Sequence, residues 1–284
     1  MMRLAIRCRR SDAEAALAEL LDLAPSGVEE VSEPDGRTEL VEYAVYGAPG
    51  ELPDLGTLEA AVGNALVEVR SQRVPDDWNE RWKRFYHPVL IGGQLYVRPP
   101  WERPAERGGV VEVVVDPGRA FGTGTHATTG MCLELLLTRR PERKLFRRDV
   151  PSFCDLGSGS GVLAIAAAKL GFEPVVAVDN EHAAIEESKR NARLNYVELG
   201  FLRLDFREEP APVADVVAAN LTAPLLAQVA RRWAAKDWRP GALIASGFLS
   251  SEAGSVEDAL RAAGLAERRR LDAAGWVALI AEAV

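Results

Sequence analysis

The chain has 284 residues, of which 48% are hydrophobic and 27% charged, and its formal net charge is −8. These values are typical of a globular protein with one large domain or two ordinary ones, and they disfavour collagen, coiled coil and general disorder. No stretch approaches the ~18 apolar residues of a membrane span, and charges occupy the amino terminus where a signal peptide has its apolar core. We therefore expect a cytoplasmic protein that does not bind membranes.

The three cysteines, Cys8, Cys132 and Cys154, are an odd number and include no C-x-x-C pair. Neither a disulfide framework nor a zinc knuckle is supported by this pattern. We expect reduced, mostly buried thiols, which is the usual state of free cysteine, and no metal site.

The negative charge is concentrated at one end of the chain. Residues 1–70 hold 14 Asp and Glu against six Arg, a net charge of −8, whereas the remaining 214 residues hold 28 basic and 28 acidic groups. An acidic module repels phosphate backbones and attracts basic partners, so we expect no direct binding of nucleic acid. An acidic surface that only keeps the module soluble explains the charge on its own equally well.

The first 70 residues read as an α+β module in which each run of apolar alternation is bounded by turn residues. A capping box of Ser11 and Glu14 marks the start of the first helix. The order of strands and helices is that of the split βαβ, ferredoxin-like pattern, which names no ligand. The predicted elements are a strand at Arg3–Cys8, a helix at Ser11–Asp22, strands at Val28–Ser32 and Glu39–Tyr46, a weaker helix at Leu55–Asn64 and a strand at Leu66–Arg70.

Residues 71–88 are predicted to form a linker helix between two domains. Trp78, Trp82, Phe85 and Tyr86 follow helical spacing and share one face of that helix. The stripe could pack onto a neighbouring domain or contact a partner. We favour packing, because an apolar helical stripe is most often part of a core.

Residues 89–284 are predicted to form a second, larger domain. After several short strands up to residue 115, strands and helices alternate from about Phe153 onward. Strands as apolar as VVAVD and ALIAS are buried on both faces, which indicates a parallel sheet covered by helices. Glu267–Leu271 and Trp276–Glu282 follow each other without a helix and read as an antiparallel hairpin. The expected fold is therefore α/β, a Rossmann-like doubly wound sheet with an antiparallel carboxyl-terminal hairpin, preceded by the ferredoxin-like α+β domain.

A glycine-rich loop carries the main chemical signal. Gly157, Gly159 and Gly161 follow an apolar strand and precede an apolar helix. Glycine allows a sharp turn and lets a ligand approach the backbone, as in nucleotide sites at the carboxyl edge of parallel sheets. Asp179 ends the next strand 22 residues after Gly157, close to the ~20-residue spacing at which an acidic side chain meets ribose hydroxyls. Together these features predict a nucleotide-type site.

The loop does not fit a dinucleotide or a nucleoside triphosphate. Val162 stands where the dinucleotide fingerprint has its third glycine, and the chain has no G-K-[ST] sequence. Asp155, at the entry of the loop, would repel a pyrophosphate and attract an ammonium group. S-adenosylmethionine, with its ribose, cationic amino-acid end and lack of phosphate, fits better. Asp155 could instead only cap the loop through backbone N–H groups, but we favour a direct or water-bridged contact with the ligand.

Two further segments reach the same edge of the sheet. The run DPGRAFGTGTHATT, residues 116–129, precedes an apolar helix and offers N–H and O–H donors suited to a carboxylate. An elaborate helix cap would explain one of its threonines but hardly all four. Asn220 ends the strand DVVAAN and offers both a donor and an acceptor.

The chain resembles the PrmA family of class I methyltransferases over essentially its full length. FGTGTHATT, DLGSGSGVLAIAAAKLG, the acid of VVAVD and the Asn of AANLTA match the family pattern in order, and FGTGTH is the discriminating piece. The resemblance implies transfer of methyl groups from S-adenosylmethionine to lysine or N-terminal amino groups of large-subunit ribosomal protein eleven. It also implies that the acidic residues 1–70 recognise this basic protein. We expect the enzyme to be a monomer.

The resemblance further implies the site residues. Asn220 is predicted to orient the incoming nitrogen and Phe121 to shield the methyl-transfer end of the site. His126 is the only nearby candidate for proton removal, although a loop histidine is more often a hydrogen-bonding scaffold. The predicted cofactor contacts are Thr123, Thr125, Thr129, Asp155, Gly157, Gly159, Asp179 and Asn220.

Two other functions remain open on the sequence. The first is a class I methyltransferase that acts on RNA or a small molecule, and the acidic module argues against RNA. The second is a non-catalytic adaptor that binds S-adenosylmethionine or NAD and docks through residues 1–70.

Overall fold

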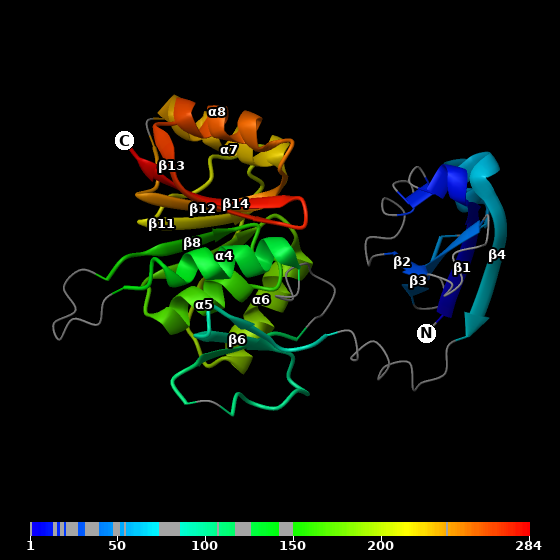
Figure 1. Cartoon of the computed structure of the whole chain (residues 1–284), viewed down its shortest axis with the longest axis horizontal. Helices are drawn as coiled ribbons and strands as arrows, with labels where there is room; N and C mark the ends of the chain where they lie inside the picture. Colours follow the sequence, from blue (N-terminus) through cyan, green and yellow to red (C-terminus); the bar gives the residue numbers. More distant parts are fainter. Residues whose placement is uncertain are drawn as a thin grey trace. The chain divides into compact units, whose positions relative to one another are not determined.

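The computed structural model divides the chain into two compact units, Met1–Phe85 and Tyr86–Val284 (Figure 1). Across the described part of the chain, no helix is long and apolar enough to cross a membrane. The structure describes residues 2–13, 16–17, 20, 28–31, 40–47, 52–53, 55–73, 86–106, 108–116, 126–141, 150–236 and 238–284.

The first unit contains an antiparallel sheet with the strand order β2-β3-β1-β4. Its strands and the helix before β4 lie where the sequence predicts them, and they enclose a core that includes Ile6, Leu20, Tyr43 and Leu58. Residues 10–12 form a 3-10 turn and residues 13, 16, 17 and 20 are helical, while the rest of the first predicted helix lies outside the described residues. The elements are β1 (Met2–Arg9), β2 (Glu29–Val31), β3 (Leu40–Gly47), α2 (Leu55–Val62), a 3-10 turn at Gly63–Ala65 and β4 (Leu66–Arg73).

Part of the acidic charge of this unit is neutralised within the sheet. Arg3 and Arg7 on β1 donate hydrogen bonds of 2.6 and 2.8 Å to the two carboxylate oxygens of Glu42 on β3. Burial raises the pKa of Glu42, but the bonds from Arg3 and Arg7 outweigh it, so the net shift is downward. Arg7 also lies 3.6 Å from the carboxylate of Glu68 on β4. These acids therefore stabilise the sheet rather than present free charge to a partner.

The second unit is built on a seven-stranded sheet with the order β10-β9-β8-β11-β12-β14-β13. β8 to β12 pair in parallel, and β14 is antiparallel to both of its neighbours. Because the strand order reverses between β8 and β11, the ends of these two strands flank a topological switch point. The strands are β8 (Phe153–Leu156), β9 (Val175–Asp179), β10 (Gly200–Arg203), β11 (Val216–Asn220), β12 (Ala242–Leu249), β13 (Leu265–Ala273) and β14 (Trp276–Ala283).

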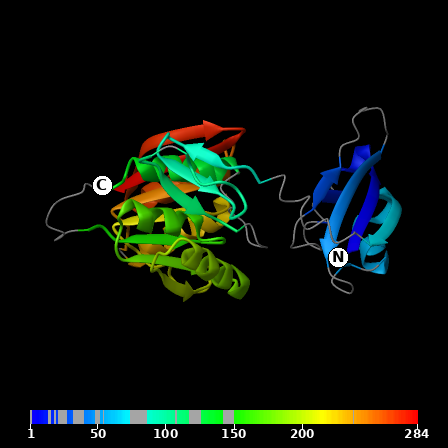
Figure 2. The same cartoon turned by 90° about the horizontal axis from the view of Figure 1, so that it is seen from below.

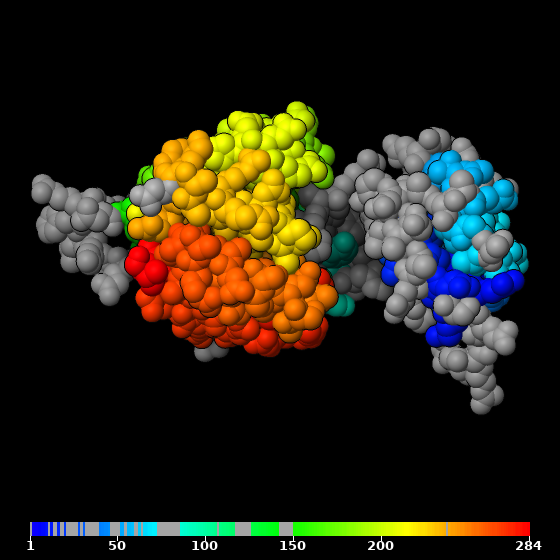
Figure 3. Space-filling view, turned by 90° about the horizontal axis from the view of Figure 1, so that it is seen from above, coloured from blue at the N-terminus to red at the C-terminus, as the bar shows by residue number. Residues whose placement is uncertain are grey.

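Helices cover both faces of this sheet, as Figure 1 shows. α4 (Ala127–Leu137), α5 (Val162–Leu170) and α6 (His182–Leu194) lie on one face. α7 (Ala223–Lys236) and α8 (Ala253–Ala262) pack side by side on the other face, and their yellow and orange surfaces are seen from outside in Figure 3. The strands are consequently buried on both sides, which explains their almost continuous apolar sequence.

A three-stranded sheet lies on the side of α4 and α5, where it appears in teal in Figures 1 and 2. β5 (Val89–Ile91) pairs antiparallel with β6 (Leu95–Arg98), and β6 pairs in parallel with β7 (Val111–Val114). Leu95, Val97 and Val113 join the core of the large sheet. The short strands predicted before residue 115 thus form a separate layer.

The α/β class, the parallel sheet and the terminal hairpin are confirmed. The hairpin joins β13 to β14 through Ala274 and Gly275, both with positive φ. The sequence analysis missed β10, which pairs in parallel with β9 at the sheet edge. This strand has four residues, of which three are exposed, so it carries no apolar run. The three cysteines are free and buried as expected, and burial raises the pKa of Cys154 to about 12.

The end of α6 places a non-glycine residue in the left-handed region. Tyr196 has φ 55° and is 96% exposed, and the bonds from Tyr196 N–H to Arg193 O and from Val197 N–H to Ala192 O form a Schellman motif. Glycine adopts this conformation without the steric cost that a Cβ adds.

We expect Tyr196→Gly to stabilise the protein by about 1 kcal/mol and to raise its Tm by roughly 2–4 °C, since the exposed side chain has little packing to lose. The control is Arg193→Gly, an exposed position within α6 that should destabilise by about 1 kcal/mol. Thermal denaturation of both variants decides the matter. A lower Tm for Tyr196→Gly would contradict this prediction, because it would mean that contacts of the tyrosine side chain stabilise the fold more than the left-handed backbone destabilises it.

Candidate active site

The glycine-rich loop connects the end of β8 to the start of α5, as the sequence predicts. Gly157 and Gly161 have φ values of +72° and +81°. A Cβ on Gly157 would lie 2.5 Å from the side chain of Leu221, and one on Gly161 would lie 2.3 Å from Ser188 Oγ. Both glycines are therefore required by the turn and by close packing at the same time.

Asp179 ties this loop to the end of β9. Its Oδ2 accepts the Gly159 N–H at 2.9 Å and its Oδ1 accepts the Glu181 N–H at 3.0 Å. The N–H groups of Gly157 and Ser158 also donate to Val178 O, at 2.8 and 3.0 Å. The glycine loop and Asp179, which the sequence assigns to one nucleotide-type site, are thus joined directly by the bond between Gly159 and Asp179.

Asp155 is fully buried beneath the loop, with 1% of its surface exposed. Its Oδ2 accepts the N–H of Ala164 in the first turn of α5 at 3.1 Å. Its Oδ1 is buried and has no hydrogen-bond partner among the described residues. Burial raises the pKa of Asp155 to about 7, and the negative charge of Asp179 adds to that rise. The carboxyl group therefore caps α5 with one oxygen and leaves the other for a donor.

Asn220 and Thr129 lie together across the switch point, as the sequence predicts. Asn220 Nδ2 donates to the hydroxyls of Thr128 and Thr129, at 3.2 and 3.4 Å. Both threonines are buried at the start of α4. Asn220 Oδ1 is buried and has no partner within the described ranges. The amide is thus held in place by two hydroxyls and retains one acceptor.

His126 is the N-cap residue of α4. Its Nδ1 lies 3.4 Å from Thr128 N and 2.8 Å from Thr128 Oγ1, and its ring meets Trp276 edge-on at 5.3 Å. This geometry is that of a scaffold that fixes the helix start. The other predicted residues of this segment, Phe121, Thr123 and Thr125, lie outside the described residues.

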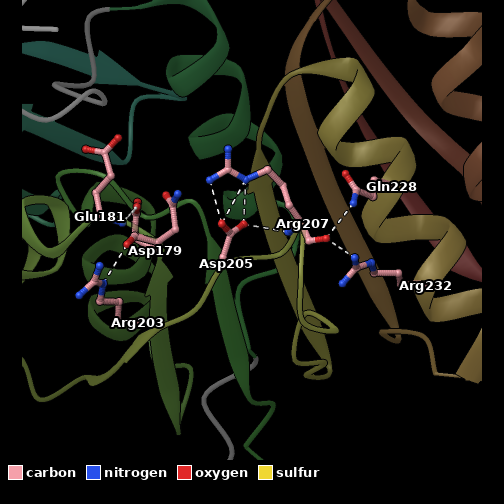
Figure 4. A network of polar contacts seen from close by, with 8 residues as sticks. Asp179, Glu181, Arg203, Asp205, Arg207, Gln228 and Arg232 are labelled. Atoms are coloured by element: carbon pink, nitrogen blue, oxygen red, sulfur yellow. Dashed lines mark hydrogen bonds and ion pairs between the residues drawn. The ribbon is translucent and has the colours of Figure 1, made fainter.

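The structure also shows an ionic network that the sequence analysis missed (Figure 4). Asp205 follows β10, and its carboxylate accepts a fork of bonds from Arg207, with Nη2–Oδ2 at 2.8 Å. These bonds lower the pKa of Asp205. The carbonyl of Arg207 in turn accepts bonds from Gln228 and Arg232 on α7. Asp205 stands out in the sequence only once β10 is recognised as a strand, because the residue then follows a strand end.

These features suit a cationic ligand with N–H groups and no phosphate. Two buried acceptors, Asp155 Oδ1 and Asn220 Oδ1, have no donor among the described residues. A pyrophosphate beside Asp155 and Asp179 would be repelled. The residues present therefore fit S-adenosylmethionine. Among the described residues, no group of three or more side chains could hold a metal ion.

Comparison with known proteins gives a family. A family model described as ribosomal protein L11 methyltransferase (PrmA) matches residues 53–283. A ribosomal protein L11 methyltransferase of Pelotomaculum thermopropionicum is 41% identical over 72% of this chain and 65% of its own length. Another, from Symbiobacterium thermophilum, is 31% identical over 99% of this chain and 98% of its own length.

A solved structure agrees with these relatives. The crystal structure of a ribosomal protein L11 methylase from Lactobacillus delbrueckii is 26% identical, with a TM-score of 0.60, over 70% of this chain and 99% of that chain. The family model covers most of the sequence, and the glycine loop, Asp179 and Asn220 all lie within the matched range. The chain therefore belongs to the PrmA family of ribosomal protein L11 methyltransferases, class I enzymes that depend on S-adenosylmethionine.

Proposed function

We propose that this chain transfers methyl groups from S-adenosylmethionine to lysine side chains or the N-terminal amino group of ribosomal protein L11. The observation that carries the proposal is the acceptor at Asn220 Oδ1, buried beside Thr128 and Thr129 at the switch point. An acceptor fixed in this way can receive an N–H of an incoming amine. Family membership supports the same reaction.

The chemistry asks the protein mainly for alignment. S-adenosylmethionine supplies an activated methyl group on its sulfonium. An attacking lysine must be neutral, and with a pKa of ~10.4 its deprotonation at pH ~7.4 costs roughly 4 kcal/mol. Holding two reactants in line can supply ~7–11 kcal/mol, which exceeds that cost. Asn220 would orient the lone pair of the attacking nitrogen toward the methyl group, and Phe121 would shield the methyl-transfer end of the site.

We assign His126 a structural role in this reaction. Its Nδ1 is engaged with Thr128 at the start of α4, so that nitrogen is not placed to take a proton from substrate. By fixing Thr128 and Thr129, His126 supports the hydroxyls that hold Asn220. Thr123 and Thr125 remain proposed cofactor contacts.

We propose that Asp155 and Asp179 serve the two ends of the cofactor. Asp179, already bound to the Gly159 N–H, would meet the ribose hydroxyls at the loop edge. The Oδ1 of Asp155 would receive the ammonium group, directly or through water. Gly157 and Gly159 remain proposed cofactor contacts in the loop between these two acids.

We infer that the module predicted at residues 1–70, whose last strand β4 continues to Arg73, is a ferredoxin-like recognition module, linked through the following residues up to 88 to the catalytic residues 89–284. The antiparallel order β2-β3-β1-β4, with α2 before β4, supports this fold. The net charge of −8 supports attraction of a basic protein and opposes RNA as the substrate. We propose that the enzyme acts in the cytoplasm as a monomer.

The assay that tests this function follows labelled methyl groups from S-adenosylmethionine onto purified L11 or onto ribosomal RNA. We expect label on L11 alone. The KM for L11 should rise several-fold between roughly 50 and 300 mM salt, because salt screens the acidic module, while the KM for S-adenosylmethionine changes less. Label on RNA alone would replace the proposed substrate, and a salt-independent KM for L11 would refute charge-based recognition.

Removal of the orienting amide provides a second test. We expect Asn220→Ala to lower kcat about 100-fold, since loss of alignment by ~1 Å has an effect of this size. Gln228→Ala is the matched control, because it deletes an amide on α7 that donates to the Arg207 carbonyl. Its kcat should stay within twofold of wild type. Steady-state kinetics with L11 would contradict the role of Asn220 if the two variants behaved alike.

Burial of Asp155 gives the ligand-free protein a pH dependence. The folded pKa of Asp155 is about 7 and lies above the unfolded value of ~3.9. The contribution of this carboxyl to stability is therefore fully present below pH ~4 and falls by on the order of 4 kcal/mol as the pH rises to ~7. Asp155→Asn removes this titration, so its stability relative to wild type should increase from pH 5 to pH 8. Urea unfolding of both proteins at pH 5 and pH 8 measures this difference in the free energy of unfolding. Asp258→Asn, at an exposed acid on α8, should parallel wild type.

A further inference from the structure

α6 buries polar side chains where a helix normally buries apolar ones. Glu187, Ser188, Asn191 and Asn195 are all buried, although α6 packs on the apolar sheet. Buried amides require hydrogen-bond partners, so the partners of the two asparagines show what this face of the helix holds.

Asn195 holds the end of β7. Its Oδ1 accepts the Val114 N–H at 2.8 Å, and its Nδ2 donates to Val114 O at 2.6 Å. β7 pairs with β6 on its other side. The side chain of Asn195 therefore takes the place of a further strand at this residue.

Asn191 joins two segments that belong to the site. Its Oδ1 accepts the N–H of Asp116 at 2.9 Å, and its Nδ2 donates to the carbonyl of Ser160 at 2.9 Å. Ser160 is part of the glycine loop, and Asp116 follows β7. The side chain is completely buried, so no water competes for these bonds. One planar amide thus fixes the distance between the two backbones.

The position of Asp116 in the chain relates this bridge to the predicted site. Asp116 directly precedes residues 117–125, which carry the predicted site residues Phe121, Thr123 and Thr125. After that segment in the chain, His126 Nδ1 accepts the Thr128 N–H, and Thr128 Oγ1 accepts a bond from the amide of Asn220. Asn191 therefore joins Asp116, the residue before the segment, to the glycine loop.

We infer that Asn191 is a positioning residue for the cofactor site, which holds Asp116 and the glycine loop at a fixed separation through its bonds to Asp116 and Ser160. The inference rests on the proposed function for the identity of the cofactor and substrate. Asparagine is suited to this task because its amide has a donor and an acceptor of fixed separation. Aspartate would lack the donor to Ser160, and leucine would lack both groups.

The test measures S-adenosylmethionine affinity by calorimetry and kcat with L11. We expect Asn191→Leu to weaken binding about tenfold, the effect of losing about one net hydrogen bond, and to lower kcat as well. Trp233→Phe is the matched control, because it removes a buried bond, from Nε1 to Ala211 O, on the opposite face of the sheet. It should lower Tm while leaving affinity and kcat within twofold of wild type.

A second comparison separates positioning from general destabilisation. Asn195→Leu removes the two Val114 bonds and the bond from Asn195 Nδ2 to the Asn191 backbone carbonyl, but it keeps the bond from Asn191 Nδ2 to Ser160 O, so kcat should fall while affinity stays within twofold. If Asn191→Leu does not fold, Asn191→Asp keeps an acceptor for the Asp116 N–H but removes the Nδ2 donor, which binds Ser160 O at 2.9 Å and Asp116 O at 3.5 Å, and the same loss of affinity is expected. Wild-type affinity and kcat in a folded Asn191 variant would overturn the inference. Wild-type protein that binds cofactor but leaves L11 unmodified would instead overturn the proposed function, and the affinities would still decide the role of Asn191.

Discussion

The fixed position of the glycine loop is the constraint on which the rest of the site depends. Its glycines adopt left-handed conformations that leave backbone groups without partners from regular structure. Those groups are bound from two elements, by the Asp179 side chain and the Val178 carbonyl on β9 and by Asn191 on α6. Asp155 meanwhile fixes the first turn of α5. The loop is therefore held before any ligand arrives, so little ordering remains to oppose binding.

The topology brings the second half of the site to this loop. Because β11 pairs with β8, Asn220 emerges beside the glycine loop although 59 or more residues separate them in sequence. α4 then presents Thr128 and Thr129 to the same amide. Helices on both faces of the sheet exclude water from these strands, and the low local dielectric strengthens the hydrogen bonds at their ends.

The sequence predicted the features that depend on local chemistry. Turn chemistry and periodicity act over a few residues, so they can be recognised in the sequence. They predicted the glycines at a strand-to-helix turn, Asp179 at the end of an apolar strand and the strand that ends at Asn220. The bridges from Asn191 to Asp116 and from Asn195 to Val114 span 75 and 81 residues. No local pattern says which polar residue of a helix will be buried, so these contacts and the Asp205 network needed the structure. Ferredoxin-like topology and the roles of Phe121, Thr123 and Thr125 remain predictions.

In the proposed mechanism, an amide at position 220 suits the charge of the substrate. A carboxylate there would also accept an N–H, but its charge would stabilise the ammonium form of a lysine and raise the pKa that the reaction must overcome. The amide of Asn220 would orient the nitrogen while adding no charge, and its own Nδ2 donates to threonine hydroxyls. Attraction of a basic protein would then be left to residues 1–70, because the charges of the remaining chain cancel. Separating long-range attraction from the transfer site would let the protein gather a cationic substrate without holding its amine in the unreactive protonated form.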